Sequence, residues 1–147
     1  MVNERHHKKM QKNSHYRVID ANINRASEGL RVIEDTVRFL NGDKKIFYRA
    51  RELRHGLSRV SKNIYPLLIG SRNSVGDSGG KVVDAKHRDV VAVLVANFKR
   101  AQESVRVLEE YSRLISRTAG FEFKKIRFKL YTLEKDVAKR FFGRLSD

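Results

Sequence analysis

The sequence predicts an all-α protein, a helical bundle of two duplicated helical hairpins with a Gly/Ser-rich loop between them. Three observations support this fold class. Apolar residues recur every three or four positions along most of the chain. Residues 21–40 return 75 positions later as 96–115, with nine identical side chains in the twenty. The chain also contains a single proline, Pro66, and that scarcity suits helices.

The first hairpin is expected within residues 17–69. One apolar stripe predicts a helix near 20–41, with Asp20 at its N-cap and Gly42 at its end. A second stripe predicts a helix near 43–63. Because the steps average close to 3.5 residues, we expect helices that pack almost parallel, as in a four-helix bundle.

The second hairpin is expected within residues 84–143, with helices near 85–116 and 119–142. Gly120 lies beyond the end of the first of them. The stretch from Phe121 partly alternates like a strand, but its helical pattern continues over nineteen residues. An ordinary strand is shorter, so a helix is favoured.

We therefore expect one helical domain, residues 17–147, preceded by a basic flexible tail at 1–16. Residues 70–83 form the connection between the hairpins, and 70–80 include four Gly and three Ser. Two hairpins of common origin would associate about a pseudo-two-fold axis. The long amphipathic helices also make a homodimer an open possibility.

Composition limits the function classes. The chain has no cysteine, which excludes disulfides and thiolate metal sites and favours a reducing cytosol. Its N-terminus lacks an apolar signal sequence, and the longest aliphatic run, Val90 to Ala96, is too short to span a membrane. We expect a cytoplasmic protein with no membrane partner.

The charge is strongly positive. Thirty-two Lys and Arg against 17 Asp and Glu give a net charge of +15. A basic body predicts an anionic partner, either nucleic acid, an acidic membrane or a phosphorylated small molecule. Charge by itself does not choose among them.

A helical wheel divides the polar residues of the repeat into an outer and an inner set. The outer set carries alternating charges at spacings of three and four, and together with the pair Glu34–Arg38 these charges are typical of a solvated helix face. It comprises Glu28, Arg31, Asp35 and Arg38, and in the second copy Glu103, Arg106, Glu110 and Arg113.

The inner set consists of Asn22 and Arg25 in the first copy, and Asn97 and Arg100 in the second. An arginine on a partly apolar face needs an anion, because an unpaired buried charge is costly. An inter-helix ion pair or a contact that caps helix carbonyls would satisfy that need. The alternative is a phosphate held by Arg25 or Arg100 with an asparagine beside it.

The Gly/Ser-rich loop could cradle a phosphate through the backbone N–H groups of Gly76 and Gly79. It is not a Walker A motif, because Val82 follows Gly80-Lys81. A flexible linker is the alternative. One charge of each sign among the glycines, on Arg72 and Asp77, argues mildly against a plain linker.

Several long motifs resemble a known family. They are the runs 18–39 and 96–111, the motifs Leu53-Arg-His-Gly-Leu57 and Leu130-Tyr-Thr-Leu-Glu-Lys135, and the loop 72–79. Together they resemble the monofunctional hydroxymethylpyrimidine phosphate kinases of thiamin biosynthesis, small helical domains often fused ahead of thiamin phosphate synthase.

The resemblance implies an enzyme that phosphorylates 4-amino-5-hydroxymethyl-2-methylpyrimidine phosphate to the diphosphate, using ATP and Mg²⁺. From the duplication we expect Arg25 and Arg100 to face one another across the pseudo-two-fold axis as catalytic residues, and Arg72 to close over the transferred group. The resemblance adds Arg54 and His55 to the candidates for phosphate binding, although His55 alone would be most simply a surface or capping residue.

The metal is expected at a carboxylate, and the candidates are Asp77, Glu28 and Glu103. The resemblance also implies thiamin phosphate synthase as a functional partner. Two other functions stay open: a basic helical module that binds nucleic acid, and a partner subunit of thiamin phosphate synthase without catalysis of its own.

Overall fold

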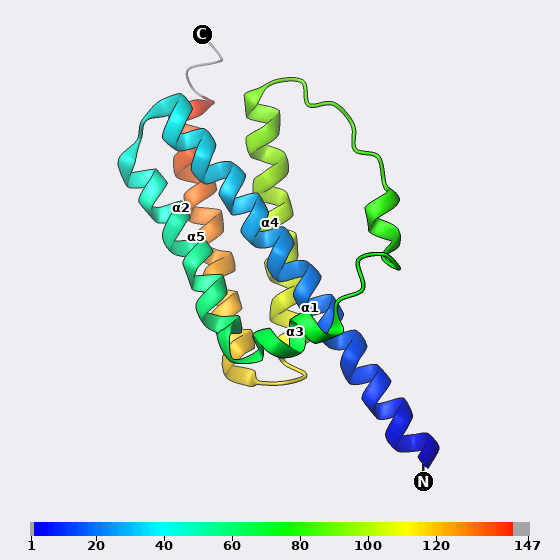
Figure 1. The fold of residues 1–147 in the computed structure, drawn as a ribbon. Coiled ribbons are helices and arrows are strands. Elements are labelled where there is room, and N and C mark those ends of the chain that lie inside the picture. Colours follow the sequence, from blue (N-terminus) through cyan, green and yellow to red (C-terminus); the bar gives the residue numbers. More distant parts are fainter. Residues whose placement is uncertain (1, 143–147) are drawn as a thin grey trace.

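The structure, a computed structural model, describes residues 2–142 (Figure 1). Within this range there is no strand, which confirms the all-α prediction. Four long helices form the body. They are α1 (Val2–Thr36), α2 (Lys44–Ser61), α4 (Val90–Ser112) and α5 (Arg117–Phe141).

Shorter elements complete the described chain. A π-helical turn, η1 (Val37–Asn41), extends α1, and Gly42 ends it in the left-handed region at φ 66°. After α2 come the 3-10 turn η2 (Lys62–Ile64) and the short α3 (Tyr65–Ser71). A second 3-10 turn, η3 (Ser78–Lys81), interrupts the long connection to α4.

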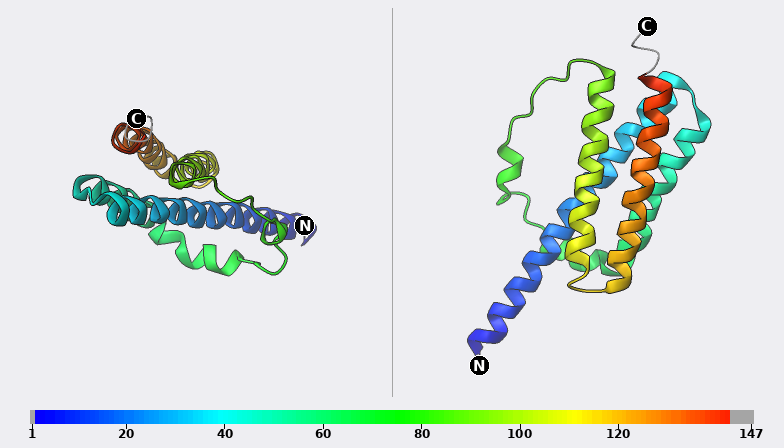
Figure 2. Two further views of the ribbon diagram at one scale, coloured as in Figure 1. Left: turned by 90° about the horizontal axis from the view of Figure 1, so that it is seen from above. Right: turned by 180° about the vertical axis from the view of Figure 1, so that it is seen from behind.

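The four long helices occupy the corners of a bundle. Helix α1 packs against α4 and α2, and α5 packs against the same two helices, while α3 lies on α1 (Figures 1 and 2). Residues at helical spacing fill the space between them, and Ile33, Leu57, Phe98 and Leu133 are fully buried. The apolar stripes of the sequence therefore form one core.

The beginning of the first helix differs from the prediction. Helix α1 starts at Val2, so residues 2–16, expected as a flexible tail, are helical, and the exposed residues 3–14 project from the bundle (Figure 1). No glycine or proline occurs before Gly29, so nothing in this stretch interrupts the helix. Asp20 is consequently not an N-cap. It lies inside α1 and is 6 % exposed.

The connection between the hairpins is longer than predicted. Asp89, not a residue near 85, caps α4, and its side chain accepts a hydrogen bond from the Ala92 N–H at 2.8 Å. That contact, with a hydrogen bond from Arg88, holds the pKa of Asp89 below its ordinary value. The chain between α3 and α4 therefore runs from Arg72 to Asp89.

The two hairpins share a side-chain hydrogen bond at positions 75 residues apart, which is the offset of the sequence repeat. The side-chain amide of Asn22 donates to the Val18 carbonyl at 2.8 Å, and that of Asn97 donates to the Val93 carbonyl at 2.8 Å. Each amide is thus fixed against its own helix. The common origin of the hairpins stays an interpretation of this likeness.

Candidate functional site

Helices α1 and α4 approach each other closely at Gly29. A Cβ atom at this position would lie 3.0 Å from the Asn97 carbonyl oxygen and 3.5 Å from the Ala101 nitrogen. Such a contact is unusually tight, so glycine allows this approach without a shift of the α4 backbone. The ring contact between His15 and Tyr111, at 6.2 Å between centroids, shows that the two helices run antiparallel.

This approach places the predicted inner set along one line, which we call the seam: Asn22, Arg25, Asn97 and Arg100. Asn22 and Arg25 precede Gly29 by seven and four residues, which puts all three on one side of α1. On α4, Arg100 comes three residues after Asn97 and one before Ala101, which are the two residues nearest to Gly29.

The two seam arginines are open to solvent. Arg25 and Arg100 are exposed, whereas Asn22 is 4 % exposed and Asn97 is half-buried. Within residues 2–142 no carboxylate forms an ion pair with either arginine. The inter-helix ion pair considered for them is thus not formed by the described residues, and both guanidinium groups are available to an anion.

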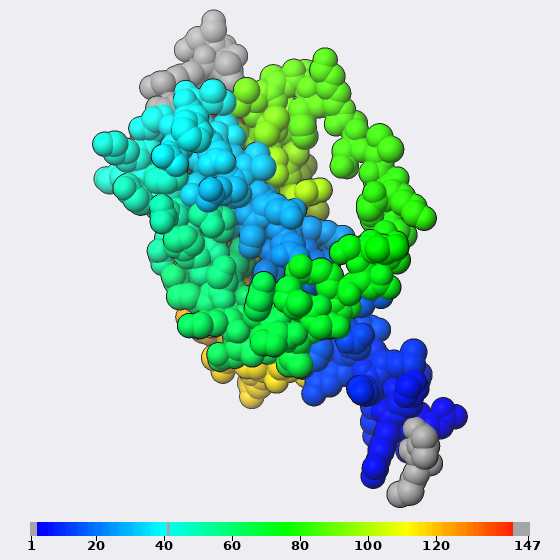
Figure 3. Space-filling view, viewed as in Figure 1, coloured from blue at the N-terminus to red at the C-terminus, as the bar shows by residue number. Residues whose placement is uncertain are grey.

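The long connection arches away from the body on the side of α1 and α4, and an opening separates it from them (Figures 1 and 3). Residues 72–89 are exposed throughout. The backbone N–H of Gly76 donates to the Asn73 side chain at 2.9 Å, and that of Gly79 donates to Asp77 at 2.8 Å. Side chains of the loop itself thus occupy the positions at which phosphate oxygens were expected.

Two of the predicted arginines form ion pairs with carboxylates of α1. The guanidinium of Arg72 donates twice to the Asp20 carboxylate, at 2.7 and 2.8 Å. Arg54 donates to Glu34 at 2.7 and 3.2 Å, and this bond raises the pKa of Arg54. His55, beside Arg54 on α2, is half-buried. The structure brings Arg54 and Arg72 to carboxylates of α1, not to the seam.

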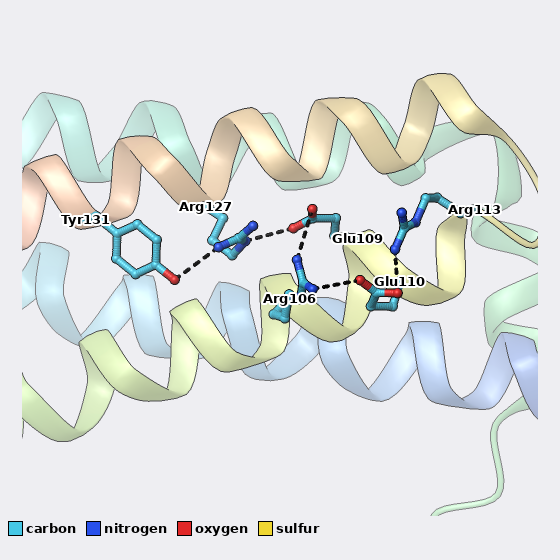
Figure 4. A network of polar contacts seen from close by, with 6 residues as sticks. All are labelled: Arg106, Glu109, Glu110, Arg113, Arg127 and Tyr131. Atoms are coloured by element: carbon cyan, nitrogen blue, oxygen red, sulfur yellow. Dashed lines mark hydrogen bonds and ion pairs between the residues drawn. The ribbon is translucent and has the colours of Figure 1, made fainter.

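A second pair matches Glu34–Arg54 in the other hairpin. Arg127 of α5 donates to Glu109 of α4 at 2.7 Å, and its guanidinium also donates to the Tyr131 hydroxyl at 3.2 Å (Figure 4). Burial acts to raise the pKa of Glu109, but the Arg127 hydrogen bond and the charges of Arg127, Arg106 and Lys124 outweigh it. The pKa lies below its ordinary value.

These buried pairs were not predicted. Glu34 had been placed among the solvated charges, yet its side chain is 3 % exposed. A usable signal was present, because Glu34 and Glu109 are equivalent in the repeat and an arginine follows Leu53 and Ile126 in matching motifs. The pairs join the two helices of each hairpin.

Comparison with known proteins places this arrangement in a family. The ThiD2 family matches residues 17–136. This range holds the seam, both buried pairs and the long loop. The chain belongs to the ThiD2 family.

Curated relatives of this ThiD2 chain are longer proteins named thiamine-phosphate synthase. The protein of Nostoc punctiforme is 36% identical over 125 residues, which cover 83% of this chain and 35% of the relative. That of Thermosynechococcus vestitus is 38% identical over 122 residues, covering 81% and 34%. That of Rhodopirellula baltica is 35% identical over 135 residues, covering 86% and 35%. The chain thus spans about a third of the length of these relatives. No solved structure matches.

The candidate metal ligands of this ThiD2 chain are scattered. Glu28 and Glu103 are exposed on α1 and α4, and Asp77 caps η3. Across residues 2–142 no group of three His, Asp or Glu side chains could hold a metal ion. Mg²⁺ needs no such cage, because it binds through one or two carboxylates together with substrate phosphates and water. A single exposed carboxylate therefore fits this metal.

A groove that the sequence did not predict lies between α2 and α5, across the bundle from the seam. Its volume is about 790 Å³. Leu53 and Ile126 form part of its apolar floor, and Arg59, Lys125 and Lys129 line its rim. None of the predicted site residues borders it.

No helix of the described chain is long and apolar enough to cross a membrane.

Proposed function

We propose that this protein phosphorylates 4-amino-5-hydroxymethyl-2-methylpyrimidine phosphate to the diphosphate, with ATP and Mg²⁺, in thiamin biosynthesis. Membership of the ThiD2 family supports the pathway. So does the similarity to one third of proteins named thiamine-phosphate synthase. That name belongs to the relatives, and this chain matches about a third of their length.

One observation carries the proposal. Arg25 and Arg100 occupy equivalent positions of the repeat, are exposed on the same seam, and have no carboxylate partner among residues 2–142. A kinase for a phosphorylated acceptor has two sets of phosphates to hold. Two related arginines, each beside an asparagine amide, suit that task.

The chemistry requires little more than positioning and charge. A phosphate monoester has a second pKa of about 6, so the acceptor is largely ionised at neutral pH and needs no strong general base. Catalysis of phosphoryl transfer rests on alignment and on neutralising the phosphate oxygens. We assign one Asn/Arg pair of the seam to the substrate phosphate and the other to the nucleotide phosphates.

A metal ion would supply further positive charge between the phosphates. Glu28 and Glu103 are the best candidates, because they are exposed on the two helices that form the seam. Asp77 is a weaker candidate, since its carboxylate already accepts the Gly79 N–H. The loop that carries Asp77 would cover the seam and reduce the access of water to the transferred phosphoryl group.

The direct test is turnover. Purified protein is incubated with ATP, Mg²⁺ and the pyrimidine phosphate, and ADP and the pyrimidine diphosphate are measured together. We expect both in equal amounts, and neither without the pyrimidine phosphate. No turnover would contradict the proposal. In that case tight RNA binding that weakens steeply with salt would favour a nucleic-acid module. Binding to a separate thiamin phosphate synthase would favour a partner subunit.

A further inference from the structure

The loop between the hairpins begins at an ion pair between Arg72 and Asp20. Arg72 is the first residue after α3, and both its hydrogen bonds end on Asp20 of α1, 52 residues earlier in the chain. The Asp20 side chain is 9 % exposed, so the pair is partly shielded from water. A two-bond contact between a guanidinium and a carboxylate fixes orientation as well as distance.

The position of Asp20 on α1 explains what this contact does. Asp20 precedes Gly29 by nine residues, which is two and a half helical turns, so the two lie on opposite sides of α1. Asp20 is therefore on the side away from α4. The loop starts there and must pass around α1 to reach Val90 of α4 (Figures 1 and 2).

The two ends of the loop are fixed by different means. At its start, Leu68 of α3 is buried at 1 % exposure and Arg72 is held by Asp20. At its finish, Asp89 caps α4. Between them the residues are exposed, and their described hydrogen bonds stay within the loop. The course of the loop thus depends on where Arg72, at its start, is held against α1.

We propose that Asp20 is a positioning residue, which acts through Arg72 to hold the loop beside the seam. This inference rests on the proposed kinase function only for its effect on catalysis. It changes the role expected of Arg72: its guanidinium sets the path of the loop and does not contact the transferred phosphoryl group.

The position of the loop is tested without any assay of activity. The chain has no cysteine, so Ser78→Cys on η3 and Lys99→Cys on α4 allow two spin labels and a distance measurement by pulsed electron resonance. We expect Asp20→Asn to broaden and shift the distance distribution. Arg72→Lys keeps the positive charge but cannot donate two parallel hydrogen bonds to the carboxylate, so we expect a smaller change of the same kind. Asp35→Asn is the control, because its pair with Arg31 is exposed and 3.8 Å long. An unchanged distribution for Asp20→Asn would overturn the inference.

Kinetics separate positioning from direct contact. We expect Asp20→Asn and Arg72→Gln each to lower kcat/KM about ten-fold, and the double variant to lower it no further, while Asp35→Asn leaves it unchanged. If Arg72→Gln lowers kcat/KM far more than Asp20→Asn, Arg72 contacts the reacting group and the inference is wrong. Thermal unfolding of each variant shows whether the fold is kept. If the wild type has no activity, the proposed function fails and the distance measurement still decides the role of the ion pair.

Discussion

Glu109 of α4 and Arg127 of α5 form an ion pair at 2.7 Å, with side chains 7 % and 12 % exposed. Glu34 and Arg54 form the matching pair in the first hairpin, at 2.7 Å and with 3 % and 22 % exposed. Each pair joins the two helices of one hairpin, at positions that correspond in the sequence repeat. The seam arginines have no such carboxylate among residues 2–142. Each hairpin therefore contains two structurally distinct arginine positions, one paired between its helices and one exposed on the seam.

Replacing Glu109 by Gln should destabilise the fold. The change leaves the Arg127 guanidinium largely buried and without a carboxylate partner. We therefore expect the free energy of unfolding to fall by about 3 kcal/mol at pH 7. Chemical denaturation measures this. Glu110→Gln is the control, because Glu110 is exposed and its pairs with Arg106 and Arg113 lie on the surface. It should change stability by less than about 0.5 kcal/mol.

The pH dependence of the same variant has a definite sign. The pKa of Glu109 in the folded protein lies below its ordinary value of 4.5. The stability that this ionised carboxylate supplies is therefore fully present above about pH 4.5 and is lost as the pH falls through the lower, folded-state pKa. The difference in unfolding free energy between wild type and Glu109→Gln should shrink as the solution is acidified below pH 4.5. A difference that grows on acidification would contradict this account of the pair.

Glycines 29 and 56 should respond to alanine in opposite ways. At Gly29 the new Cβ would lie 3.0 Å from the Asn97 carbonyl oxygen of α4. The helices would have to separate, and we expect a net loss of about 1 kcal/mol even after the gain in helix propensity. At Gly56 the new Cβ would make an ordinary 3.6 Å contact with Ile126. There we expect a gain of up to about 1 kcal/mol. Equal effects on thermal unfolding would show that α1 and α4 are not tightly packed.

The metal assignment predicts a difference among the three carboxylates. Glu28→Gln and Glu103→Gln should each raise the Mg²⁺ concentration needed for half-maximal activity, by about ten-fold for the true ligand. High Mg²⁺ should then restore much of the rate. Asp77→Asn should affect the loop more than the metal requirement, because Asp77 caps η3. A metal requirement that is the same in all three variants would place the ligand elsewhere.

The sequence was sufficient for the fold class. Apolar stripes of helical period depend on local spacing, so they predicted the four long helices and most of the core. The position of Arg25 relative to Gly29 likewise follows from the helical period. What the pattern could not show was the partner of each charge. Asp20 and Arg72 are 52 residues apart and meet only because α3 packs on α1.

Two errors have different physical origins. Asp20 was predicted as an N-cap because aspartate is common there, yet the stretch before it contains nothing that ends a helix, and α1 continues to Val2. Glu34 was predicted as a solvated charge because its neighbours on α1 are charged. Packing of α2 against α1 instead buries it beside Arg54. The groove between α2 and α5 has no sequence signal, since it arises from the packing of two hairpins.

The central claim is that this chain transfers a phosphoryl group with the help of the two seam arginines. The most direct measurement follows label from γ-³²P-ATP into the pyrimidine diphosphate, for wild type and for Arg25→Ala, Arg100→Ala and the double variant. We expect labelled product from the wild type and a loss of at least about 100-fold in the double variant, with thermal unfolding close to that of the wild type. No label in the product of the wild type, or a double variant of near-native kcat/KM, would contradict the account.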